Sequence, residues 1–81
     1  MAGLFIKLDT NYWGHPKIVA VGYLPGVLYQ QMSMYCMDHA TDGHVPDAVL
    51  PRFGMPRVRH QVEALAGVGL IERDGEGWLV P

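Results

Sequence analysis

The sequence predicts a small α+β domain in which several helices are followed by a C-terminal β-hairpin. Two observations indicate this class. Segments bounded by glycine and proline, with apolar side chains at helical spacing, fill most of residues 16–67. The segment "LIERDGEGWLV" then places a glycine-rich tip between two short apolar runs, as a hairpin requires. With 81 residues the chain can form one modest core, so we expect a single domain over 1–81.

The first two elements are expected from alternation and from proline. "LFIKLD" alternates apolar and polar side chains from Leu4 to Asp9, which predicts a half-buried strand. We expect this strand to pair with the C-terminal hairpin, because a hairpin alone is marginally stable in water. Pro16 then suits the first turn of a short helix that ends at Gly22.

A longer helix is expected to begin at Pro25, because "GVLYQQMSMYCMDHA" contains no helix breaker. It is apolar nearly all round, and such a helix is usually buried on more than one side. Core packing is therefore the favoured role. A side facing a partner is the alternative, and Tyr29, Met34 and Met37 are its candidate residues, either for another protein or for a homodimer.

The next segment predicts two helices joined by a tight turn. Asp42-Gly43 is a strong turn signal, and a short helix is expected over about 46–53. After the turn "GMP", an amphipathic helix is expected over 56–67. Together with a hairpin at 70–80, this order is that of a winged helix-turn-helix, in which the hairpin is the wing.

In that arrangement the second helix places its N-terminal residues in the major groove of double-stranded DNA. The candidate DNA contacts are Arg57, Arg59, His60 and Gln61 for the groove, and Arg52, Lys17 and Arg73 for the phosphates. The chain's formal net charge is −2, so it has no general attraction for a polyanion. Support for DNA binding must therefore come from where the basic residues lie, and they cluster between positions 52 and 73. A dimer would double the number of phosphate contacts.

The predicted wing argues for a different role. Its tip carries Glu72, Asp74 and Glu76 with only Arg73 as a basic residue, and these carboxylates would repel phosphate. We therefore expect the wing to be structural or to face a protein partner. The main alternative function is a winged-helix interaction module that docks onto a host or phage protein without binding DNA.

Three segments carry a family resemblance: "FIKLDTNYWGHPKIVAVG", "TDGHVP" and "ALAGVGLIERDGEGWLV". They resemble small winged-helix proteins of actinobacterial phages and prophages, and the N-terminal domains of phage replisome-organiser proteins. The matching positions are Phe5, Lys7, Asp9, His15, Pro16, Lys17, Asp42, Gly43, Val45, Pro46, Gly69 and Leu70. The resemblance implies a DNA-binding protein of phage replication or transcription control, acting in the cytoplasm of a bacterial host cell.

Other chemistries are less favoured by the sequence. Cys36, His39 and His44 could supply three zinc ligands, but no second pair has ligand spacing, so we expect no metal and no cofactor. Cys36 lies among apolar residues, where a thiol is usually inert, so we do not expect an enzyme. A single cysteine fits a reducing cytoplasm. No apolar run approaches the roughly 20 residues of a membrane span, so no membrane partner is expected.

Overall fold

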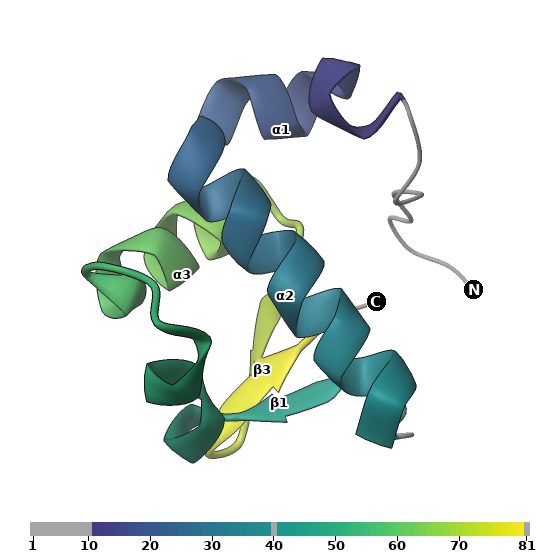
Figure 1. Ribbon diagram of the computed structural model, residues 1–81, viewed down its shortest axis with the longest axis vertical. Coiled ribbons are helices and arrows are strands. Elements are labelled where there is room, and N and C mark those ends of the chain that lie inside the picture. The colour runs from purple at the N-terminus through teal and green to yellow at the C-terminus, as the bar shows by residue number, and fades with distance from the viewer. Residues whose placement is uncertain (1–10, 40, 81) are drawn as a thin grey trace.

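In the computed structural model, residues 11–39 and 41–80 are described, and they form helices packed on a small antiparallel sheet (Figure 1). The elements are the 3-10 helix η1 (Tyr12–Gly14), α1 (Pro16–Val21), α2 (Tyr23–His39), β1 (His44–Pro46), the 3-10 helix η2 (Asp47–Phe53), α3 (Val58–Gly67), β2 (Glu72–Asp74) and β3 (Gly77–Leu79). The α+β class is confirmed. The strand expected at 4–9 lies outside the described residues.

The two N-terminal α-helices follow from the positions of proline and glycine. Pro16 is the first residue of α1, and Gly22 ends that helix with a φ of 95°, as expected. Helix α2 begins at Tyr23, two residues before the predicted start. Pro25 is thus the third residue of α2, and proline is tolerated there because N–H groups in the first turn of a helix lack intrahelical partners.

The predicted turn at 42–43 is confirmed and leads into the sheet. Asp42 and Gly43 have positive φ values of 54° and 90°, which suits a two-residue turn. The turn is closed by His44, whose backbone N–H donates to the carbonyl of Thr41 at 3.1 Å. After this turn, β1 runs beneath the C-terminal end of α2 (Figure 1).

The sheet has the order β1-β3-β2, with β3 antiparallel to both neighbours. Val45 on β1 and Arg73 on β2 are both opposite Trp78 on β3. Side chains opposite one another share a face of a sheet, so these three lie in a row on one face. Within the described part of the chain, β1 is the strand that supports the predicted hairpin.

The core lies between α2, α3 and the sheet. Its fully buried side chains include Leu28 and Met32 from α2, and Val62 and Leu65 from α3. Tyr29, which was a candidate for a partner-facing side of α2, also belongs to the core, with only 2% of its surface exposed. That prediction is wrong, because Tyr29 lies on the side of α2 that packs against the rest of the domain. Burial raises the pKa of its phenol.

The N-terminal part of the described chain is fixed by a second buried tyrosine. Tyr12 in η1 is almost fully buried, and its hydroxyl donates to the carbonyl of Gly26 in α2. Burial, and to a lesser extent the nearby Tyr29, raises the pKa of Tyr12 well above its ordinary value. Trp13 packs edge-on against Tyr12 and stacks on Tyr23 with ring centroids 5.3 Å apart. These contacts hold η1 against the start of α2.

Candidate nucleic-acid interface

The two helices of the predicted helix-turn-helix are joined by a turn with unusual backbone geometry. Helix η2 ends at Phe53, and Gly54 follows in the left-handed region with a φ of 69°. Helix α3 begins at Val58, two residues after the predicted start at Pro56. The later start has a local cause, because Arg57 also adopts the left-handed conformation, with φ 50° and ψ 51°, and so interrupts a continuous helix.

Gln61 does not lie on the outer face of α3, and its predicted role as a groove-reading residue is wrong. Only 3% of its surface is exposed. Its side-chain Nε2 donates to the backbone carbonyl of Pro56 at 3.3 Å, which closes the turn before the helix. The signal for this position was present in the sequence. Val58, Gln61, Val62 and Leu65 have the spacing i, i+3, i+4, i+7 of an inward-facing stripe.

Four of the predicted DNA contacts surround this turn and are exposed. Arg52 is on η2, Arg57 precedes α3, and Arg59 and His60 lie in the first turn of α3. Glu63, one helical turn after Arg59, is an exposed acidic residue on the same helix. The N-terminal end of α3 therefore presents a cluster of basic side chains, and the negative charge lies further along the helix.

Lys17 is separated from this cluster. A methyl group built on Gly69 would lie 3.5 Å from the Lys17 Nζ, which places the lysine beside the chain just after α3. Helix α3 has ten residues, so its two ends are about 15 Å apart. The structure thus places Lys17 near the opposite end of α3 from Arg57, and we leave it out of the candidate interface.

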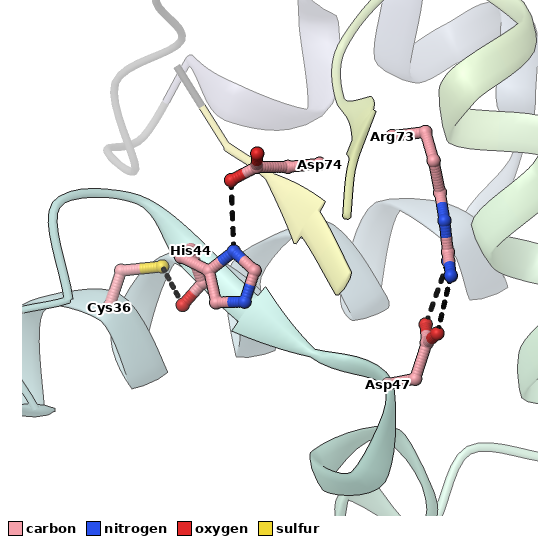
Figure 2. Close-up of polar contacts among 5 residues, drawn as sticks. All are labelled: Cys36, His44, Asp47, Arg73 and Asp74. Carbon is pink, nitrogen blue, oxygen red and sulfur yellow. Dashed lines mark hydrogen bonds and ion pairs between the residues drawn. The ribbon is translucent and has the colours of Figure 1, made fainter. Parts of the chain in front are cut away.

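Arg73, a predicted phosphate contact, is paired with a carboxylate in the same chain. Its two terminal nitrogens donate to the two carboxylate oxygens of Asp47 at 2.9 and 2.6 Å (Figure 2). The guanidinium also lies 5.0 Å from the centroid of the Trp78 ring. The hydrogen bonds from Arg73 hold the pKa of the Asp47 carboxyl below its ordinary value. Sequence reasoning missed Asp47, because the pair joins residues that are 26 positions apart.

The acidic residues of the β2–β3 hairpin are exposed, and one of them is paired. The Asp74 carboxylate lies 3.0 Å from Nδ1 of His44, so this contact joins the two outer strands across β3 (Figure 2). The contact between His44 and Asp74 passes over Gly77 of β3. A Cβ added at Gly77 would lie 2.8 Å from the His44 ring, so a glycine leaves room for the contact. Asp74 and Arg73 point to opposite faces of the hairpin because they are neighbours on β2 (Figure 2).

A second surface lies on the C-terminal half of α2. Met34 and Met37, which were candidates for a partner interface, are 59% and 72% exposed. They line a shallow hollow of about 630 Å³ together with Tyr35, Phe53 and neighbouring residues of α2. Gln31 anchors Phe53 beside the helix, because its Nε2 donates to the Phe53 carbonyl at 3.0 Å. The hollow is apolar and opens to solvent.

The alternative zinc ligands are engaged in other contacts. The His39 ring stacks on Tyr35 with centroids 4.3 Å apart, and the His44 ring faces Asp74. The Sγ of Cys36 lies 4.0 Å from the backbone oxygen of His44, not from its ring (Figure 2). Within residues 11–39 and 41–80, no three histidine, cysteine or acidic side chains are close enough together to hold a metal ion.

Comparison of the chain with protein-family models, with curated proteins and with solved structures finds no match. No helix in the described part of the chain is both long and apolar enough to cross a bilayer. Function is therefore inferred from the arrangement of the side chains.

Proposed function

We propose that this protein is a winged helix-turn-helix domain that binds double-stranded DNA through the N-terminal end of α3. One observation carries the proposal: four exposed basic side chains surround the η2–α3 turn, at the end of the helix that enters the major groove in this class of motif. The element order and the sheet order β1-β3-β2 are compatible with that motif. The two C-terminal strands form the wing.

The residues at the turn have separate roles in the proposed complex. Arg57 and Arg59 carry planar guanidinium groups suited to bidentate contact with guanine edges or phosphate oxygens. His60, beside them, donates a hydrogen bond to a base edge or a phosphate. Arg52, on the preceding helix, contacts the phosphate backbone and fixes the orientation of α3 in the groove. The positive end of the α3 dipole adds a smaller attraction for phosphate.

The affinity of a single copy for DNA is expected to be low and dependent on salt. Three phosphate contacts give a slope of about −3 in a plot of log affinity against log salt concentration. A rise from about 50 to about 200 mM salt would then weaken binding about 40-fold. The acidic residues of the wing oppose tighter binding. The resemblance to phage replication proteins is the support for a more specific role in phage replication or transcription control.

The test is binding of fluorescent mixed-sequence duplex DNA at those two salt concentrations. The double variant Arg57→Gln with Arg59→Gln removes two positive charges from the proposed interface. Lys17→Glu changes the net charge by the same amount at the far end of α3, and is the matched control. We expect the double variant to lose most of the affinity and of the salt dependence, and the control to bind like the wild type.

Two results would overturn the proposal. The first is an absence of wild-type binding at about 50 mM salt, a condition that favours phosphate contacts. The second is equal loss of affinity in the double variant and in Lys17→Glu, because that would show a response to net charge and not to the position of the arginines.

A second candidate function is protein association through the methionine surface, meaning the hollow formed by Met34, Met37 and their neighbours. The exposure of two large apolar side chains one helical turn apart favours it. Sedimentation of the wild type over a range of concentrations, compared with Met34→Gln plus Met37→Gln, tests the homodimer form of this function. An association that the double variant abolishes would support it, and a monomer at all concentrations would remove the homodimer.

A further inference from the structure

The contact between Arg73 and Asp47 has the geometry of an arginine bound to phosphate. The two terminal nitrogens of Arg73 donate to the two carboxylate oxygens of Asp47 at 2.9 and 2.6 Å (Figure 2). Arginine makes the same bidentate pair of parallel hydrogen bonds with a carboxylate or with a phosphate. The donors point from the wing toward the start of η2, and thus toward the helix-turn-helix. The Asp47 carboxylate occupies the position that a phosphate group would take.

Three elements converge on this contact. Arg73 comes from the wing, Asp47 from η2 and Arg59 from α3. The hydrogen bonds from Arg73 are the main cause of the lowered pKa of the Asp47 carboxyl, and the nearby charge of Arg59 makes a small further contribution. The three side chains line a groove of about 180 Å³ whose lining also includes Val62, Glu63 and Trp78. Two arginines on different elements therefore lie beside Asp47 in this groove, and Glu63 of α3 is a second carboxylate in its lining.

We propose that this groove is a phosphate-binding site, which the Asp47 carboxylate fills in the free protein and leaves when a DNA phosphate binds to Arg73. This inference rests on the proposed DNA-binding function and adds to it a self-blocking contact in the wing. The wing is then a conditional part of the interface, although three of its four charged side chains are acidic.

The exchange is physically accessible. The Arg73 and Asp47 side chains are both about half-exposed, and exposed ion pairs are weak because water and salt screen them. Arg73 can keep its contact with the Trp78 ring while it changes its anionic partner. The hydrogen bonds to Asp47 raise the pKa of Arg73, and the charges of Glu63 and Glu76 add to this rise. Glu63 and Glu76 also repel an incoming phosphate. A free anion therefore competes poorly with Asp47 for Arg73. A DNA phosphate competes well only because the rest of the interface holds it close to Arg73.

The test compares Asp47→Asn with Glu72→Gln in the duplex-binding assay. Each variant removes one negative charge, and Glu72 is an exposed wing residue on the same strand as Arg73. We expect Asp47→Asn to tighten binding about threefold or more at about 50 mM salt. One additional phosphate contact should also make the loss between about 50 and 200 mM salt about 3.5-fold greater. Glu72→Gln should change the affinity less than twofold and leave the salt slope unchanged.

The double variant Asp47→Asn with Arg73→Gln shows whether the gain passes through Arg73. We expect it to lose the gain completely. If Asp47→Asn binds DNA no better than Glu72→Gln, or more weakly than the wild type, the pair is only a structural clamp between η2 and the wing, and the inference is overturned.

A separate probe distinguishes failure of this inference from failure of the proposed function. Inorganic phosphate is titrated into wild type and Asp47→Asn while the Arg73 side-chain Nε–H resonance is followed. A shift in Asp47→Asn that is absent from the wild type supports the blocked site even if duplex DNA does not bind. No shift in either protein, with DNA binding unchanged by Asp47→Asn, refutes the site and leaves DNA binding by α3 intact.

Discussion

Arg57 is a position at which the proposed function and the stability of the fold conflict. Its backbone is left-handed, with φ 50° and ψ 51°, a conformation that costs a residue with a Cβ about 1–2 kcal/mol. Its side chain is exposed and makes no capping hydrogen bond in α3. Arg57→Gly therefore removes the steric cost and a solvated side chain, and leaves the core untouched.

The expected change in stability is the difference between two effects. Glycine relieves about 1–2 kcal/mol in the folded state but gains freedom in the unfolded state that costs about 0.4–1 kcal/mol. The free energy of unfolding should thus rise by about 0.5–1 kcal/mol. In a domain of this size that corresponds to an increase in melting temperature of about 2–8 °C. DNA affinity should fall about fivefold or more, the cost of one lost arginine contact.

Thermal unfolding followed by circular dichroism, together with duplex binding, measures both effects. Arg57→Ala is the control, because it removes the same charge and keeps the Cβ. We expect the alanine variant to lose affinity like the glycine variant but to gain no stability. A lower melting temperature for Arg57→Gly would refute the assignment of strain to this turn. Wild-type affinity in both variants would refute the assignment of Arg57 to the interface.

Three further predictions concern the core, the sheet and the buried phenols. Leu65→Ala should lower the free energy of unfolding in urea by about 2–5 kcal/mol, and the exposed Val19→Ala by less than about 0.5 kcal/mol; equal effects would contradict the core assignment. Gly77→Ala should destabilise the sheet, because its Cβ would lie 2.5 Å from a backbone oxygen of β1, and unchanged melting would contradict that packing. The raised pKa values of Tyr12 and Tyr29 favour their neutral forms in the folded state, so this stabilisation is complete below about pH 10 and is lost as pH rises further. Urea unfolding should therefore give a lower free energy of unfolding at pH 11 than at pH 9. An equal free energy of unfolding at the two pH values would contradict the burial of these phenols.

Local chemistry made much of the fold predictable from the sequence. Pro16 and Gly22 bound α1 because proline suits a first helical turn and glycine tolerates a positive φ. The turn at 42–43 and the hairpin tip near Gly75 were predictable for the same reason, since both require left-handed backbone. The start of α2 was predicted two residues too late, because proline is compatible with any position of a first turn.

The candidate site was less predictable, because its errors arise from tertiary contacts. Gln61 is polar, yet its amide finds a backbone partner and so can occupy an inward position of α3. Tyr29 and Met34 lie on one helix that is apolar nearly all round, so the sequence alone did not indicate which of them faces the core. The pairing of Arg73 with Asp47 depends on how β2 lies against η2 in the folded chain, which no local pattern reveals.

The central claim is that the N-terminal end of α3 contacts DNA. The most direct measurement is a titration of isotopically labelled protein with a short duplex at about 50 mM salt, followed through backbone amide resonances. We predict that the largest shifts occur within residues 52–60, with smaller ones at Arg73 and little change at Met34 and Met37. Shifts confined to the methionine surface, or no shifts at all, would contradict the assignment of DNA binding to α3.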